Sequence, residues 1–246
     1  MKKSLLLLFA FLTISCQVTE TLHLNSDGSG IIEFEALRDE NSYMQIAREE
    51  YSKEDVFKDT TYIFGDYIKK HRETFSRTPL ADQQVFLRYS EVKIHRKASS
   101  YEKEFRTVYT QNFKKSSDIV DFTKADHYLD DIKNNYALSA EEHYYNVCYD
   151  YIGNRFHRIV TITDTLMHKK EYERLEKVKD KYKGYKLVQN FALNYHFPRK
   201  IQSVSNPLAK ISDDCKSMTI QFALSDCLQN PLITNLEVIL EPETVD

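Results

Sequence analysis

Residues 18–37 have the sequence VTETLHLNSDGSGIIEFEAL, and this stretch points to the fold class. Apolar and polar side chains alternate over residues 21–24 and over residues 32–36, which is the period of a half-buried strand. Between these arms, Asn and Asp favour a turn through their side chains, and Gly28 supplies positive φ. The stretch therefore predicts a β-hairpin.

The turn also resembles the start of a calcium loop, because Asn25, Asp27 and Gly28 have the right spacing. Position twelve of such a loop supplies a bidentate carboxylate. Here that position is Ala36, which has no oxygen in its side chain. We therefore expect a turn and no metal.

The same two kinds of pattern continue along the chain. Alternation predicts strands within residues 91–114, 143–163 and 187–197, and a last hairpin with arms at 217–224 and 236–240. Helical spacing predicts helices within residues 40–75, 80–90, 116–135 and 164–182. Strands joined by tight turns pair antiparallel. We expect an α+β fold: one continuous, mostly antiparallel sheet built from hairpins, with inserted helices packed on one face.

The first fifteen residues differ from the rest. Lys2 and Lys3 precede an apolar run from residue 5 to residue 14, and Ser15 is a small residue before Cys16. This is the pattern of a secretory signal peptide, and the run is too short to span a bilayer. We expect a signal peptide at residues 1–15 and a single α+β domain at residues 16–246.

Residues 12–16 (LTISC) resemble a lipobox, the site at which lipoprotein signal peptidase cleaves before a lipidated cysteine. Thr13 stands where Leu is usual, so the match is of the looser kind found in Bacteroidota; an ordinary signal with a chance cysteine is the alternative. The resemblance implies lipidation of Cys16. Two or more acyl chains then hold the chain to a membrane. Gln17 is not the Asp that resembles an inner-membrane retention signal, and no acidic cluster follows. We therefore expect an outer-membrane lipoprotein that faces the periplasm.

Composition and motifs exclude several function classes. The net charge of −3 gives no basic field for nucleic acid. The sequence has five glycines, no phosphate-binding loop, and no H-E-x-x-H, C-x-x-C or G-x-S-x-G motif. We expect no catalytic activity, no cofactor and no metal.

Three further features can each be explained either by a structural role or by a function. His127, Asp130 and Asp131 have the spacing of metal ligands on one helix face, although a solvated polar face is expected. Arg158 falls among apolar strand positions, so an internal ion pair (Asp150 is near in sequence), an edge position or a ligand contact would explain it.

The third feature is Cys215, in the segment Ser212-Asp213-Asp214-Cys215-Lys216. This segment fits a type I turn followed by a left-handed residue. Cys215 stands where Gly or Asn is usual, either as a tolerated substitution or as a reactive thiol, and we expect positive φ there. Cys215 and Cys227 flank a predicted strand and lie too far apart for a disulfide.

The two ends of the chain resemble a set of uncharacterised Bacteroidota envelope lipoproteins. The resembling segments are the lipobox, residues 20–22 (ETL) with 27–30 (DGSG), and residues 195–201 (YHFPRKI) with 204–206 (VSN). The resemblance implies a cellular location and a fold, and it implies no catalysed reaction. Two functions remain open: a non-catalytic binding or scaffolding module for an envelope protein partner, or a carrier of a lipid or other apolar ligand. A carrier predicts a closed cavity, and a scaffold predicts a filled core.

Overall fold

A computed structural model describes residues 16–136, 138 and 144–242, and these residues form two β-sheets with helices. The larger sheet has eight strands in the order β10-β11-β8-β1-β2-β5-β4-β3, and the smaller has four in the order β6-β7-β12-β9. The strands of the larger sheet are β1 (Cys16–Leu24), β2 (Gly30–Arg38), β3 (Phe57–Ile63), β4 (Lys93–Ser99), β5 (Glu104–Phe113), β8 (Asn190–His196), β10 (Lys210–Ile211) and β11 (Ser217–Ala223). The strands of the smaller sheet are β6 (Tyr145–Ile152), β7 (Arg155–Ile162), β9 (Ile201–Val204) and β12 (Leu236–Leu240).

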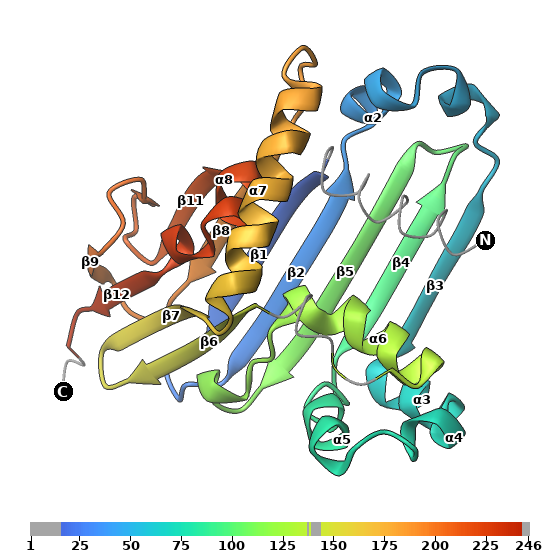
Figure 1. Ribbon diagram of the computed structural model, residues 1–246. Coiled ribbons are helices and arrows are strands. Elements are labelled where there is room, and N and C mark those ends of the chain that lie inside the picture. The colour runs from blue at the N-terminus through green and yellow to red at the C-terminus, as the bar shows by residue number, and fades with distance from the viewer. Residues whose placement is uncertain (1–15, 137, 139–143, 243–246) are drawn as a thin grey trace.

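The helices lie at both ends of the larger sheet and over one of its faces (Figure 1). The α-helices are α2 (Glu40–Ala47), α3 (Phe64–Lys70), α4 (Arg72–Phe75), α5 (Leu80–Leu87), α6 (Ala125–Asn134), α7 (Thr165–Tyr182) and α8 (Leu224–Gln229). The 3-10 helices are η1 (Arg48–Lys53), η2 (Ser116–Asp118), η3 (Phe122–Lys124) and η4 (Pro231–Thr234). The predicted α+β class is confirmed.

The predicted first hairpin is present as β1 and β2, which pair antiparallel from Cys16↔Arg38 to Leu24↔Gly30. Gly28 in the turn has φ 81°, which a residue without a Cβ adopts at low cost. Asp27 Oδ1 accepts a hydrogen bond from the Ser29 amide at 2.9 Å. The turn therefore uses the positive φ of glycine and the side-chain hydrogen bond of Asp, as the sequence predicts.

The prediction of one continuous sheet is wrong, and so is the final hairpin. β11 pairs with β8 and β10 in the larger sheet, whereas β12 pairs with β7 and β9 in the smaller one. α8 and η4 lie between β11 and β12 and carry the chain from one sheet to the other. Alternation marked both arms correctly as strands, but it does not specify the strand with which each arm pairs.

The predicted helix over residues 40–75 is also wrong in its centre, because residues 57–63 form β3. Thr60, Thr61, Tyr62 and Ile63 are β-branched or aromatic and favour a strand. β3 pairs with β4 alone and is one of the two edge strands of the larger sheet. Lys58 and Asp59 place charge on this edge, which discourages pairing with another chain.

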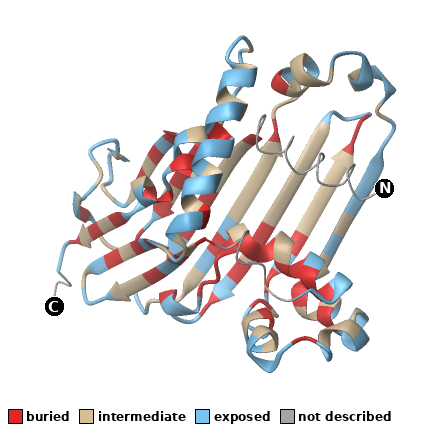
Figure 2. Cartoon of the chain, viewed as in Figure 1, coloured by how far each residue is buried: buried red, intermediate tan, exposed pale blue. Residues whose placement is uncertain are grey.

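The core lies between the two sheets and under α6 (Figure 2). Even-numbered residues of β1 face it, including the fully buried Leu22. Phe156, from β7, contacts Tyr195 and Phe197 edge-on, with ring centroids 5.5 Å apart in both pairs. Aromatic side chains thus fill the space between the sheets.

Candidate functional site

The expected lipidation residue, Cys16, is the first residue of β1, a central strand of the larger sheet. The predicted signal peptide at residues 1–15 lies outside the described residues. Cys16 is opposite Arg38 of β2, and the next residue, Gln17, is opposite Asn190 of β8. The side chain of Cys16 faces the core and is 4% exposed. No spacer therefore separates this cysteine from the folded sheet.

Burial raises the pKa of the Cys16 thiol to about 12, although the nearby Arg38 guanidinium acts in the opposite direction. The thiolate is the reactive form of cysteine. In the folded chain the Cys16 thiol is thus protonated and a poor nucleophile.

Arg38 fastens the segment after β2 to this end of the sheet. Its guanidinium donates to Glu54 through two nitrogens, each at 2.9 Å, and to Glu40 Oε1 at 2.6 Å. The guanidinium carbon also lies 3.2 Å from the centroid of the Phe105 ring and 3.8 Å from that of Tyr43. We call these five residues the Arg38 cluster. It links β2, α2, β5 and the residue after η1, so the loops beside Cys16 are held in place.

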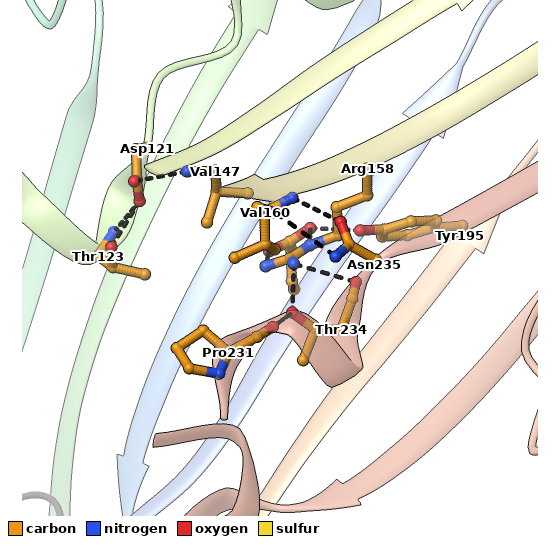
Figure 3. A network of polar contacts seen from close by, with 10 residues as sticks. Asp121, Thr123, Val147, Arg158, Val160, Tyr195, Pro231, Thr234 and Asn235 are labelled. Atoms are coloured by element: carbon orange, nitrogen blue, oxygen red, sulfur yellow. Dashed lines mark hydrogen bonds and ion pairs between the residues drawn. The ribbon is translucent and has the colours of Figure 1, made fainter. Parts of the chain in front are cut away.

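A second polar cluster lies between the two sheets (Figure 3). Arg158 of β7 donates to both carboxylate oxygens of Glu20 on β1, each at 3.1 Å. Its third nitrogen donates to Thr234, at 2.7 Å to the hydroxyl and 3.2 Å to the carbonyl. The Tyr195 hydroxyl donates to Glu20 Oε1. The cluster thus joins both sheets to η4.

Burial, followed by the Glu20 charge, raises the pKa values of Tyr149 and Tyr195 well above the usual value for tyrosine. Both hydroxyls therefore stay protonated, and that of Tyr195 donates to the Glu20 carboxylate. The side chains of Arg158 and Glu20 are 3% and 2% exposed. With its polar atoms engaged with one another and away from solvent, this cluster is suited to hold the sheets together.

Of the explanations for Arg158, the internal ion pair is confirmed, but its partner is Glu20 and not Asp150. Glu20 precedes Arg158 by 138 residues. Asp150 is opposite His157 in the β6–β7 pair, so its side chain faces away from Arg158. Sequence analysis missed Glu20; the signal was a carboxylate at an inward position of the alternating pattern.

Asp121 ties the segment between η2 and η3 to the smaller sheet (Figure 3). Its carboxylate accepts hydrogen bonds from the Val147 amide at 2.9 Å and from the Thr123 amide at 3.1 Å. Burial raises the pKa of this carboxyl, while Lys124 and the hydrogen bonds oppose the shift. The Asp121 carboxylate thus accepts the hydrogen bond of the Val147 amide in β6, in place of a backbone carbonyl.

The expectation that His127, Asp130 and Asp131 share a solvated helix face is wrong for Asp131. Asp131 is buried on the inner side of α6, Asp130 is exposed and His127 is half-buried. Among the described residues, no group of three or more His, Cys, Asp or Glu is arranged to hold a metal ion.

Cys215 has φ 58°, so the predicted left-handed residue is confirmed. Its amide donates to the Ser212 carbonyl at 2.9 Å, and the Ser212 amide donates to the Ser217 carbonyl at 3.0 Å. These bonds close the turn between β10 and β11. All four cysteines of the chain are free thiols.

Two open hollows of moderate size lie on the surface of the described residues. One, of about 320 Å³, lies between α7, α8 and residues 185–189 and is lined by Leu175, Val178 and Leu187 among others. The other, of about 350 Å³, lies on the polar face of the larger sheet between Glu35, Lys93 and Arg106. Both open to solvent, and neither lies between the two sheets.

Within the described residues, no helix has the length and apolarity needed to cross a bilayer. No protein-family model matches the chain, and no curated protein matches it. The comparison with solved structures matches the folded domain of the LppM protein from Mycobacterium tuberculosis, determined by NMR. The two chains are 8% identical with a TM-score of 0.39, over 94% of this chain and 92% of that one.

Proposed function

We propose that this chain is a membrane-anchored envelope lipoprotein whose folded domain is a non-catalytic binding or scaffolding module. The observation that carries the proposal is the position of Cys16, which ends a signal-peptide pattern and begins a central strand. Cleavage before Cys16 would leave the whole of β1 in the mature chain. The Cys16 side chain is buried in the folded chain, so a lipid on its thiol would require that side chain to turn out of the core, and would then attach the first residue of the sheet to the bilayer.

The burial of the Cys16 thiol, which is 4% exposed, bears on when this modification would take place. A thiol with a pKa of about 12 is almost entirely protonated at neutral pH. Attachment of a lipid to it in the folded domain would be slow, because the thiolate is the reactive form. We infer that lipidation precedes the folding of β1, while the precursor is still at the membrane.

Metabolic labelling with an alkyne fatty acid tests the anchor. The protein should carry the label, and Cys16→Ala should abolish it. Cys148→Ala is the matched control, because Cys148 is an exposed cysteine in a strand and its loss should leave the label unchanged. A label that survives Cys16→Ala would refute the anchor.

The same proposal includes a location, the outer membrane facing the periplasm, which rests on Gln17 after the cysteine and on the missing acidic cluster. Protease added to intact cells should leave the domain uncut, whereas protease added after the outer membrane is permeabilised should digest it. Digestion in intact cells would instead indicate display on the surface.

Packing between the sheets favours a scaffold over a carrier. Phe156 is fully buried against Tyr195 and Phe197, and the Glu20–Arg158 pair takes the polar positions of the same region. The two hollows described above lie on the surface, where an envelope protein partner has access. Crosslinking in cells should therefore yield a defined protein partner, and organic extraction of purified protein should release no stoichiometric lipid beyond that on Cys16. Release of one equivalent would support the carrier.

A further inference from the structure

The end of the larger sheet that contains Cys16 also carries a group of exposed apolar side chains. Loops from both sides of β1 meet here, at the upper edge in Figure 1: α2 and η1, the turn between β4 and β5, and the segment between α7 and β8. The exposed apolar residues at this end are Met44, Val56, Phe57, Tyr101 and Val188. We call this set the anchor-end surface.

Two of these side chains are among the most exposed large apolar groups of the described chain. Phe57 is 67% exposed and Tyr101 is 73% exposed. They belong to one corner, because Phe57 is opposite Ser99 at the end of β4 and the Ser100 amide donates to the Val56 carbonyl at 2.9 Å. The Tyr101 hydroxyl donates to Asp55 at 2.6 Å, which fixes its ring at the rim.

Hydrogen bonds make the anchor-end surface continuous. The Val188 amide donates to the Ser42 hydroxyl at 2.8 Å, and Arg48 donates to the Tyr185 hydroxyl at 2.6 Å. These contacts join the segment before β8 to α2 and η1. On the other side, the Arg38 cluster holds the same loops to β2 and β5. The anchor-end surface is therefore rigidly attached to the larger sheet.

The position of the proposed anchor determines which partner the anchor-end surface contacts. Since Cys16 is itself the first residue of β1, a lipid on its thiol, once that side chain has turned out of the core, leaves only this one residue between the bilayer and the sheet. The corner at β3 is four strand spacings from β1 in the sheet, roughly 19 Å at the usual separation of neighbouring strands. The strand ends at this edge are then brought to the membrane surface together.

We propose that the anchor-end surface rests in the headgroup region of the membrane that holds the lipid, with Phe57 and Tyr101 inserted. This inference depends on the proposed lipidation of Cys16. Aromatic side chains with a polar tip favour this region of a bilayer, and apolar groups enter it by 5–10 Å in interfacial proteins. The strands then stand upright on the membrane and project α3, α4 and α5 away from it.

The charges of this end identify the kind of membrane contact. Lys53 and Lys103 lie among Glu50, Asp55 and Glu102, so the surface has no dominant sign. Attachment should therefore come from apolar insertion, and it should not need anionic lipid or weaken with salt.

The absence of tryptophan from the sequence allows a direct test. Phe57→Trp creates a single fluorescent reporter at the anchor-end surface, and Leu80→Trp creates the matched control. Leu80 is 76% exposed, is equally apolar, and begins α5 at the opposite end of the sheet (Figure 1). Both reporters are placed in the full, lipidated protein, which is inserted in phosphatidylcholine vesicles with or without brominated acyl chains.

Emission from residue 57 should shift to shorter wavelength in vesicles and be quenched by the brominated lipid, at low and high salt alike. Emission from residue 80 should show neither effect. Tyr101→Trp is a second reporter in the same corner, in case residue 57 does not tolerate the larger ring. Absence of quenching at both 57 and 101, or equal quenching at 80, would overturn the inference.

Flotation of the vesicles separates this outcome from failure of the proposed function. Protein that carries the fatty-acid label and floats, but shows no quenching at residues 57 and 101, refutes the orientation and leaves the anchor intact. Protein that carries no label refutes the anchor itself.

Discussion

Cys215 adopts a left-handed backbone conformation, with φ 58°, in the turn between β10 and β11. A Cβ costs roughly 1 kcal/mol or more in this conformation. Cys215→Gly should raise the free energy of unfolding by a few tenths to about 1 kcal/mol, because relief of strain outweighs the added freedom of the unfolded chain. Urea denaturation measures the change.

The matched control for Cys215 is Cys148→Gly, which makes the same substitution in the extended backbone of β6. Glycine within a strand should lower stability by roughly 0.5–1 kcal/mol. If both variants lose stability to the same extent, strain at residue 215 is not the cause.

His23 and His196 stack on the polar face of the larger sheet, with ring centroids 4.2 Å apart and planes at 3°. Desolvation, and then the His23 charge, lowers the pKa of His196 below the usual 6.5. The folded state therefore binds fewer protons at this site than the unfolded state. The contribution of the pair to stability is present above pH 6.5 and is lost as pH falls through 6.5 and below.

NMR titration of the His196 ring should give a pKa below 6.5, and His23→Gln should move that pKa upward. His71→Gln is the control. The pKa of His71 is lowered too, but its causes are desolvation, Lys70 and Lys133. This control should leave His196 unchanged; an unchanged pKa in His23→Gln would exclude coupling between the stacked rings.

Among the elements, α2 and η1 depend on the Arg38 cluster for their position. Arg38→Lys keeps the charge but loses the planar fork that donates to Glu54 through two nitrogens. We expect a loss of about 1–3 kcal/mol and faster amide exchange confined to residues 40–54. Equilibrium unfolding and hydrogen exchange read the two effects separately.

The control for Arg38 is Arg106→Lys, whose half-exposed side chain pairs with Glu35 at 2.9 Å on the polar face. An exposed pair contributes about 0–1 kcal/mol, so little change is expected. Uniform acceleration of exchange across the domain in Arg38→Lys would contradict a local role.

At the scale of the whole molecule, the Glu20–Arg158 pair joins the two sheets. Arg158→Met removes one partner and leaves the Glu20 carboxylate buried without its counter-charge. Such a change costs about 3–5 kcal/mol. Thermal or urea unfolding measures the loss.

The double variant Glu20→Leu with Arg158→Met tests the origin of that cost. The double variant removes the uncompensated Glu20 carboxylate, so it should be more stable than Arg158→Met alone. A double variant that is less stable than the single one would show that the polar contacts to Tyr195 and Thr234, and not the uncompensated charge, dominate.

Much of the local structure was predictable, because its causes lie within a few residues. The hairpin of β1 and β2 follows from alternation and the turn at residues 25–29, and positive φ at Cys215 follows from the turn that precedes it. β4, β5, β6 and β7 were likewise indicated by their period of two. Three strands were missed. β9 and β10 are only four and two residues long. β3 has weak alternation because it is an exposed edge, so its residues are stabilised by pairing with β4 more than by their own pattern.

The sequence by itself determined most of the strands, the tight turns and the α+β class, and it predicts the anchor at Cys16. Tertiary structure alone decided the parallel pairing of β1 with β8, the division of β11 and β12 between two sheets, and the meeting of Glu20 with Arg158. The physical reason is that an alternating pattern specifies which face of a strand is buried, whereas its neighbours are chosen by packing among residues far apart in the chain. The exposed corner at Phe57 and Tyr101 shares an end of the larger sheet with Cys16 through the same long-range packing.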